Sequence, residues 1–413
     1  MKPLNIDEIN LTDPDFWAGP DVERAFAMLR EERPVSRHEF DAAGDEAGTQ
    51  GFWAVTRYED VVRVSSDSKL FVNGQSTILA DQSTEEAREE GWFLNMDAPE
   101  HFQMRRIVAK AFSPGAVQVM RDSARRYAKE LVSAVRERGE CDFAREVAQP
   151  FPVAVICDYL GIPDEIRSEL HRLTVVALGG DVPKLGGAPA IVSAFRELNR
   201  HCEEIARDRR KDLRDDVLSA IIRADIDGRR LSDREVGHFL QLLVTAGMET
   251  TGTVGGQGMR AFLEFPAQIQ VWRNDVEGVA HTGFEELARW VTPVRHMRRT
   301  ASADCQIAGQ SISAGDKVVM WYGSANRDSK CFERANEFDI RRNPNPHLAF
   351  GGGGRHTCLG AHFARMEVPY LFNEAFRQWD DIEMTALPQL LPSRFVNGLT
   401  SLPIRFKPAG ADA

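Results

Sequence analysis

The sequence lacks the features that would direct it to a membrane or out of the cell. No uncharged apolar stretch approaches the roughly 18 residues that a membrane span needs, and the opening MKPLNIDEINLTDPDFW has neither the basic segment nor the apolar run of a signal peptide. The six cysteines are scattered with no CxxC pair, which disfavours disulfides and structural zinc. We therefore expect a soluble cytoplasmic protein without a membrane partner, in which any functional cysteine acts alone.

Basic charge is also scarce. Lys and Arg number 51 against 62 Asp and Glu, a net charge of -11, so nucleic acid is not an expected partner, because it requires a broad basic face. Hydrophobic residues at 43% and charged residues at 27% are typical of soluble globular proteins. No internal repeats or low-complexity tails occur. We expect a single domain spanning 1–413, and a monomer.

The hydrophobic pattern predicts a mainly α protein with a small β region. Strand-like runs fall at about 31–75, 302–328 and 390–407, and helical patterns at about 99–290 and 358–380. Breaks are expected at SPG (113–115), GIP (161–163) and GGDVPKLGGAP (179–189), the last as a mobile connector. The C-terminal RFVNGLTSLPIRF predicts a hairpin with Asn-Gly at its turn.

A long helix is predicted to begin at Ser232, where SDRE forms a capping box before the apolar run HFLQLLVTA. Extended to about Phe265, it is roughly 50 Å long. Five glycines at 247, 252, 255, 256 and 258 each weaken it by roughly 1 kcal/mol relative to Ala. Packing against a neighbour accounts for some of them, and we infer that something also approaches the backbone.

The stretch FGGGGRHTCLG, Phe350 to Gly360, leaves several readings open. Its glycines do not fit the dinucleotide spacing, and no GK[ST] is present. Zinc on His356, Cys358 and His362 lacks a fourth ligand. One remaining interpretation is that Cys358 is a thiolate at a helix N-terminus, with the glycine backbone packed against a planar group. The other is that Cys358 is an inert buried cysteine that follows a turn.

FGGGGRHTCLGAHFAR resembles the haem-binding signature of the cytochrome P450 family, with Cys358 in the place of the thiolate that ligates iron. The usual Phe seven residues before the cysteine is Gly351 here, and Phe350 stands one position earlier. The resemblance covers essentially the whole chain. It implies a triangular helical prism with haem b between the long distal helix and the cysteine helix, and Phe350, Gly352 and Ala246 as haem contacts.

Further stretches resemble the family's other motifs. VTAGMETTG places Glu249 and Thr250 as the acid and alcohol that deliver protons to bound dioxygen. EELAR places Glu286 and Arg289 in a structural ionic network, completed by Arg334 or Arg341. The expected ligands of the haem propionates are His101, Arg105, Arg299 and His356. Pro369 predicts a kink or an early stop in the cysteine helix.

The resemblance implies an NAD(P)H-driven monooxygenase that uses O2. Because the length leaves no room for a reductase domain, we expect electrons from a ferredoxin and its reductase, docking on a basic patch of Arg106, Lys110, Arg341, Arg342 and Arg355. Two alternatives remain open. A peroxygenase tends to replace the acid–alcohol pair, and a non-enzymatic haem sensor would not need it.

WVTPVRHMRRTA and RFVNGLTSLPIRF look most like bacterial family members acting on sterols, terpenoids or branched lipids, in catabolism or secondary metabolism. We therefore expect hydroxylation of a bulky apolar molecule, a terpenoid or steroid-like compound that can bear a carboxylate. Arg295 is the candidate partner of that carboxylate, with an outward-facing strand arginine as the alternative. The expected pocket residues are Leu94, Leu242, Thr245, Ala246, Val294, Arg295, Phe395 and Val396.

Overall fold

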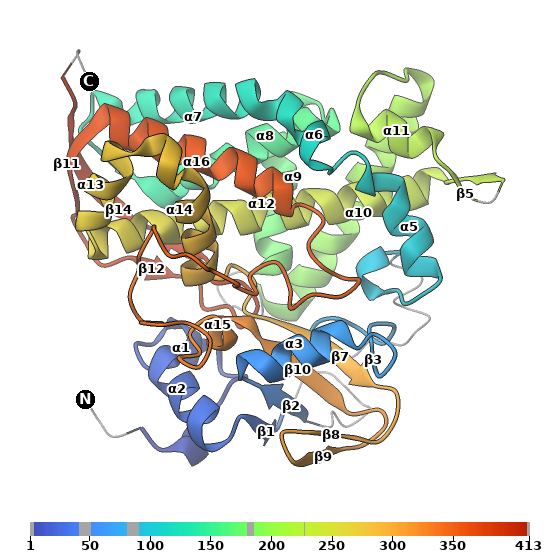
Figure 1. Ribbon diagram of the computed structural model, residues 1–413. Coiled ribbons are helices and arrows are strands. Elements are labelled where there is room, and N and C mark those ends of the chain that lie inside the picture. Colours follow the sequence, from blue (N-terminus) through green and yellow to red (C-terminus); the bar gives the residue numbers. More distant parts are fainter. Residues whose placement is uncertain (1–3, 41–50, 81–90, 180–185, 227, 411–413) are drawn as a thin grey trace.

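The structure is a computed structural model that describes residues 4–40, 51–80, 91–179, 186–226 and 228–410. A large layer of helices lies against a smaller region of strands near the N-terminus (Figure 1). The mainly α class with a small β region is therefore confirmed. The polar segment 41–50 and residues 180–185 of the expected connector lie outside the described residues.

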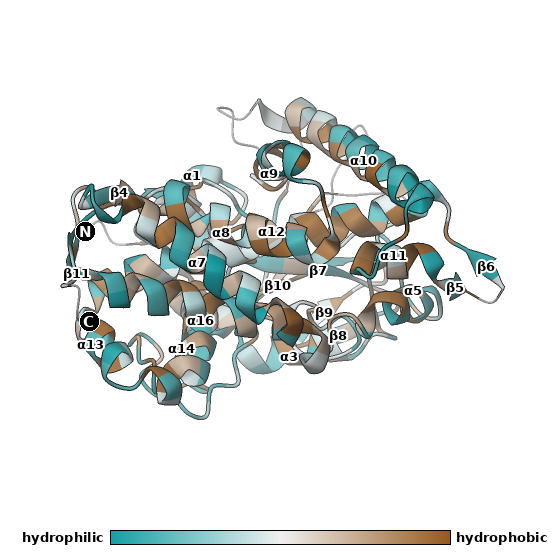
Figure 2. Ribbon diagram, turned by 90° about the horizontal axis from the view of Figure 1, so that it is seen from above, coloured by the Kyte–Doolittle hydropathy of each residue, from teal (hydrophilic) through white to brown (hydrophobic). Residues whose placement is uncertain are grey.

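The helical layer is built around α12 (Asp233–Glu264), which has 32 residues. Ser232 and Glu235 form its capping box, as predicted, and Phe265 follows as the C-cap. At 1.5 Å per residue the helix is about 48 Å long. Apolar residues line it where it runs through the interior (Figure 2). Its packed neighbours include α8 (Pro150–Leu160), α14 (Val276–Val291) and α16 (Ala361–Gln378).

The glycines of α12 allow neighbouring helices to come close. A Cβ built on Gly258 would lie 2.8 Å from Leu287 and 2.9 Å from Phe372. One on Gly252 would lie 3.4 Å from the backbone oxygen of Ala148. Most of these glycines therefore serve helix packing, and only Gly247 borders the cavity described below.

A five-stranded sheet in the order β1-β2-β10-β7-β3 forms most of the β region. Its strands are β1 (Val35–His38), β2 (Phe52–Val55), β10 (Lys317–Trp321), β7 (His296–Ala301) and β3 (Phe71–Val72). β10 runs parallel to β2 and antiparallel to β7, with Val318 opposite Arg299. The sheet therefore brings the N-terminal segment beside residues 296–321 of the chain.

The remaining helices surround these two parts. They are α1 (Pro14–Ala18), α2 (Val22–Glu32), α3 (Tyr58–Ser66), α5 (Glu100–Ala109), α6 (Pro114–Val117), α7 (Arg121–Arg136), α9 (Asp164–Leu178), α10 (Gly187–Lys211), α11 (Val217–Arg223), α13 (Ala267–Asn274) and α15 (Tyr322–Ala325). The minor strands are β4 (Glu140–Asp142), β5 (Asp225–Ile226), β6 (Arg229–Arg230), β8 (Cys305–Ile307), β9 (Gln310–Ile312), β11 (Trp379–Met384), β12 (Gln389–Leu390), β13 (Leu399–Ser401) and β14 (Pro403–Pro408). The break predicted at 161–163 falls between α8 and α9. At 113–115, Ser113 is the N-cap of the short helix α6, and Pro114 and Gly115 are its first residues.

Three local predictions need correction. The run YEDVV belongs to α3, because its buried residues follow the helical spacing of Val61, Val64 and Ser65. Asn397 is no hairpin turn residue, since its amide nitrogen donates to Val291 O and its partner Gly398 has no positive φ. Helix α16 continues through Pro369 to Gln378, so the early stop is wrong; buried apolar residues on both sides of the proline hold the helix against its neighbours.

Candidate active site

The glycine-rich loop before α16 is shaped by close contact with α3. Gly351, Gly353 and Gly354 have φ of 98°, 90° and 81°, values that side chains disfavour. A Cβ on Gly354 would lie 2.6 Å from Ser65 O, and one on Gly352 would lie 2.9 Å from Ser65 Cβ. Gly352, expected to contact a cofactor, therefore faces α3 instead, while Gly351 borders a cavity.

Cys358 lies at the end of this loop, three residues before α16 begins. Its backbone N–H donates to Phe350 O at 2.9 Å, and its side chain is exposed to a cavity deep in the protein. Burial raises the pKa of the thiol, while the N–H groups of Gly360 and Ala361 and the charge of Arg105 act in the opposite direction. Backbone donors beside a sulfur suit a thiolate that binds a metal ion.

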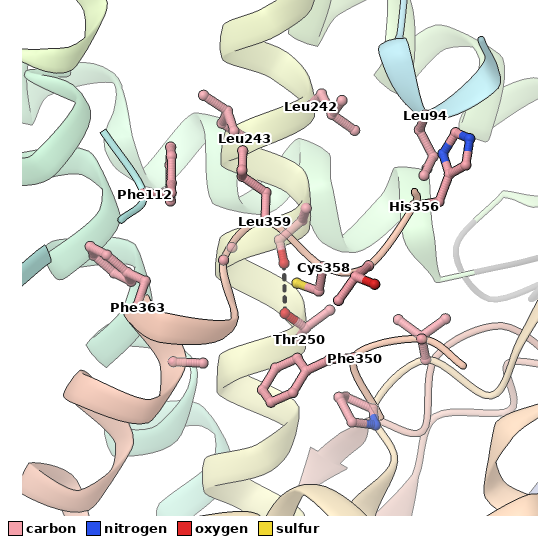
Figure 3. Close-up of a pocket in the computed structure, with 18 of the residues that line it drawn as sticks. Leu94, Phe112, Leu242, Leu243, Thr250, Phe350, His356, Cys358, Leu359 and Phe363 are labelled. Carbon is pink, nitrogen blue, oxygen red and sulfur yellow. Dashed lines mark hydrogen bonds between the residues drawn. The ribbon is translucent and has the colours of Figure 1, made fainter. Parts of the chain in front are cut away.

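Helix α12 forms the opposite wall of this cavity. Ala246, Gly247, Thr250 and Thr251 line it, and Figure 3 shows Thr250 near Cys358 with Phe350 beside both. The Thr250 hydroxyl donates to Ala246 O at 2.6 Å, within its own helix. The cavity thus places a sulfur on one wall and a hydroxyl on the other.

Four cationic or imidazole side chains gather at one edge of the cavity. The rings of His101 and His356 lie 3.9 Å apart, and Arg105 Nη2 donates to Thr357 O at 2.6 Å. Arg299 is 4% exposed, and within the described ranges no carboxylate lies within 4 Å of Arg105 or Arg299. Nε2 of His101 and Nδ1 of His356 are buried without partners. Burial, followed by neighbouring charges, lowers the pKa of His101 to about 4 and that of His356 to about 2.

Unpaired donors and cations at one edge of a cavity call for an anionic ligand. The cavity edge therefore fits a cofactor with acidic substituents, and Cys358 would be a ligand of its metal. A zinc site at this point is not supported, because His362 lies in a separate groove with Glu285. In the described part of the chain no three His, Cys, Asp or Glu side chains form a metal cluster.

Comparisons with known proteins agree with this geometry. The family model for cytochrome P450 matches residues 283–385. A methyl-branched lipid omega-hydroxylase of Mycobacterium tuberculosis is 39% identical over 97% of this chain and 95% of its own length. A steroid C26-monooxygenase of Rhodococcus jostii is 36% identical over 97% of this chain and 85% of its own. A Mycobacterium marinum cytochrome P450 solved in complex with pseudoionone has a TM-score of 0.91 at 36% identity, over 98% of this chain and 100% of that one.

The chain is a cytochrome P450. The P450 fold predicted from the sequence is thereby confirmed, and so is the class of activity, that of a monooxygenase. Enzymes of this family use haem b and O2, with electrons from NAD(P)H supplied through redox partners. In this P450, Cys358 would bind the iron, and Arg105, Arg299, His101 and His356 would hold the propionates, because both arginines line this cavity and Nε2 of His101 and Nδ1 of His356 have no other partner.

Glu249, expected beside Thr250 at the oxygen side, does not border the cavity. It is 7% exposed and its Oε2 has no partner, and its Oε1 lies 3.4 Å from the position of a Cβ on Gly398. The carboxyl group therefore points toward the loop before β13. Burial raises its pKa to about 7, so the carboxyl group is close to half protonated near neutral pH.

The expected pocket residues of this P450 divide into two sets. Leu94, Leu242, Ala246 and Val294 line the cavity as predicted. The others do not line it: Thr245 donates to Gln241 O within α12, Phe395 packs on His296, Val396 is fully buried in a bridge to Val294, and Arg295 points to Ser393 and Trp17.

Glu286 and Arg289 form the expected buried pair, with both side chains fully buried and two contacts of 2.7 Å. The third member is Arg342, whose Nε lies 3.1 Å from Glu286. Arg334 and Arg341 do not contact Glu286. Arg334 pairs on the surface with Glu337 and Asp339. Because the Arg342 side chain is 8% exposed, it is also unavailable to the basic docking patch.

One acidic residue at this site, Glu367, was not predicted from the sequence. Glu367 of α16 borders the cavity and accepts a hydrogen bond from Thr251 Oγ1 at 3.1 Å. Burial raises its pKa to about 8, against the opposing effect of Thr251. An available signal was its place four residues after Phe363, on the same face of the helix. Other lining residues that were missed are Phe93, Phe112, Ile156, Leu243, Met297, Tyr322 and Phe363.

No helix in the described ranges is both long and apolar enough to span a bilayer.

Proposed function

We propose that this P450 hydroxylates the apolar end of a bulky branched molecule, a methyl-branched lipid, terpenoid or steroid. The observation that carries the proposal is an apolar part of the cavity lining, formed by Leu242, Leu243 and Ala246 of α12 together with Leu94 and Val294. Burial of hydrocarbon against an apolar lining is favourable by roughly 25 cal/mol per Å² of apolar surface removed from water. Such a site takes in the hydrocarbon end of its substrate.

The relatives support the same substrate class, because two of them are a methyl-branched lipid omega-hydroxylase and a steroid C26-monooxygenase, and a third was solved in complex with pseudoionone. The described lining contains three charged residues: Arg105, Arg299 and Glu367. The two arginines belong to the propionate edge. The earlier expectation that Arg295 binds a substrate carboxylate is therefore withdrawn, and an acidic group of a substrate would lie away from this part of the cavity.

We further propose that Thr250 and a buried acid manage protons. Bound haem supplies the activation of O2 and the insertion of one oxygen atom into a C–H bond. The Thr250 hydroxyl borders the cavity and can accept a proton at Oγ1 from one neighbour while donating its own. Glu249 lies at the adjacent position of α12 with an unpartnered Oε2, so a change of its side-chain rotamer or a bridging water has to connect the two.

A small acidic ferredoxin, reduced by its own reductase, is the proposed electron donor. Arg105 connects α5 to the loop just before Cys358. Arg106 of the same helix and Lys110, its C-cap, are exposed. Arg355 of the loop is exposed as well. These cations surround the cysteine side of the protein, where complementary charge speeds association.

Titration of the haem-loaded enzyme with a branched fatty acid, its methyl ester and a steroid tests the substrate proposal. We expect displacement of bound water, seen as a spin-state shift, with the ester at least equal to the acid. Product analysis should place the new hydroxyl at or near the terminal branch. Tight binding of small polar compounds instead, or oxidation beside the carboxyl group, would contradict the proposal.

The ferredoxin proposal is tested by charge reversal. Arg106→Glu should slow reduction by a ferredoxin and reduce its dependence on salt. Lys407→Glu is the control, because Lys407 is exposed on β14, which lies at the opposite side of the molecule from α5 in Figure 1. Equal rates and equal salt dependence for both variants would refute the docking surface.

A further inference from the structure

A second, small cavity lies between the N-terminal helices and the segment that joins α14 to β7. Its volume is about 30 Å³, and its lining includes Trp17, Glu23, Trp290, Arg295, Trp321 and Arg327. Helices α1 and α2, which carry Trp17 and Glu23, lie beside α15 in Figure 1. None of these six residues borders the cavity at Cys358. The function proposed above makes no use of this place.

Two guanidinium groups face this cavity with few partners. Arg295 and Arg327 are 8% and 9% exposed. Arg295 Nε donates to Ser393 O at 3.0 Å, and Arg327 Nη2 donates to Trp290 O at 3.1 Å. Each guanidinium also stacks on an indole, 4.7 Å from the ring centre of Trp17 for Arg295 and 3.5 Å from that of Trp290 for Arg327. Among the described residues, no carboxylate lies within 4 Å of either group.

Two buried cations without a counter-ion are costly, because each charge has lost its hydration. Burial lowers the pKa of Arg295 to about 9 and that of Arg327 to about 10, with Glu23 opposing both shifts. Glu23 is exposed on α2 and forms no ion pair within 4 Å in the described chain. Its negative charge therefore compensates the arginines only from a distance.

The cavity also contains a neutral donor that has no acceptor. Trp321 lines it, is 1% exposed, and its Nε1 is buried without a hydrogen-bond partner. Buried N–H groups are nearly always paired in native proteins. Two cations and one unpaired N–H around the same space share a single requirement, an acceptor that carries negative charge.

We propose that this cavity binds a small inorganic anion of the chloride class. A volume of about 30 Å³ holds a monatomic ion or a similarly small anion, and it is too small for a phosphate ester or a lipid carboxylate with its chain. The anion accepts from both guanidinium groups and from the indole N–H. It thereby links the strand β10, the segment that precedes β7 and the residues that follow α15.

The consequence is a stability that depends on the kind of anion. A ligand that binds only the folded state stabilises it according to its concentration and affinity. Chloride should therefore raise the melting temperature of the haem-loaded enzyme by about 2 °C over gluconate at equal ionic strength, in a saturable way. Gluconate serves as the reference because it is too large for the cavity.

Crystals grown in bromide test the site directly and require no variant. An anomalous peak within hydrogen-bond distance of Arg295 and Arg327 is expected. Absence of that peak, together with equal melting temperatures in chloride and gluconate, would overturn the proposal. A chloride effect without the bromide peak would also overturn it, because the effect would then arise elsewhere.

Variants separate this site from general salt effects. Arg295→Met should abolish the chloride-dependent rise, and Trp321→Phe should weaken the chloride affinity severalfold through loss of one N–H. Arg209→Met is the control: Arg209 is buried but pairs with Asp216 on α10 and α11, away from this cavity, so the chloride response should persist. Glu23→Gln should raise the chloride affinity. If it instead lowers the melting temperature equally in both salts and removes the chloride response, Glu23 is the counter-ion and the proposal fails.

Discussion

Replacing Glu286 by Gln removes the negative charge that pairs with Arg289 and Arg342 at the centre of a buried network. Its carboxylate accepts hydrogen bonds from five donors: Arg289 Nε and Nη2 at 2.7 Å each, Asp339 N at 2.9 Å, and Arg342 Nε and Asn345 Nδ2 at 3.1 Å each. Glutamine keeps the shape but presents an NH2 group to the guanidinium groups. Both arginines then lose their counter-charge while Arg289 stays fully buried.

Breaking a buried ion pair from one side costs about 3 to 5 kcal/mol. Unfolding entropy of about 2.1 cal/mol/K per residue gives a 413-residue chain about 0.9 kcal/mol/K, so the melting temperature should fall by about 4 to 6 °C. Thermal unfolding of the haem-loaded enzyme, followed by circular dichroism, measures this shift.

A matched surface variant is Glu383→Gln, since Glu383 pairs with Arg405 while both side chains are more than half exposed. That substitution should shift the melting temperature by less than about 1 °C. Equal shifts for the two variants would show that the network around Glu286 contributes no more than a surface ion pair, and the reasoning would be refuted.

Three further outcomes are expected. Thr250→Ala should divert electrons from product to hydrogen peroxide while Thr250→Ser retains coupling; unchanged coupling in the alanine variant would remove Thr250 from the proton path. Arg299→Met should speed transfer of haem to apomyoglobin about tenfold or more, whereas Arg230→Met should not, and equal rates would show that Arg299 does not hold a propionate. Because the pKa of Glu367 is raised to about 8 in the folded state, the folded protein keeps a carboxyl proton that the unfolded chain loses, so the free energy of unfolding should fall as pH rises from about 4.5 to about 8. Glu367→Gln should remove this fall, which amounts to up to about 5 kcal/mol, and parallel urea-unfolding profiles of both proteins would contradict this.

The sequence predicted correctly those helix boundaries that neighbouring residues in the chain determine. The capping box at Ser232 and Glu235 and the apolar run behind it determined where α12 begins, and the break at GIP follows from glycine and proline chemistry. The region of Tyr58 was misassigned because a helix follows a short strand after only two residues. Over so few residues the alternating pattern of a strand and the 3.6-residue pattern of a helix cannot be distinguished.

Side-chain direction was the part that the sequence could not supply. Arg295 follows Val294 directly, yet Val294 faces the large cavity and Arg295 a different one. Glu249 adjoins Thr250, but one helical step of about 100° turns it away from the cavity. Arg342, rather than its neighbour Arg341, completes the network of Glu286. Such choices between adjacent residues depend on which elements pack around them, and that is decided by tertiary structure.

The glycine loop that carries Cys358 takes its form from a helix almost three hundred positions earlier in the chain. Ser65 Oγ donates to Gly353 O at 3.0 Å, and the closeness of α3 is what bars a side chain at Gly352 and Gly354. The sixteen-residue signature therefore depends on α3 for its backbone conformation. Transplanted alone into a foreign scaffold it would lack its counterpart, so an engineer who wants to build such an iron site has to carry both pieces across.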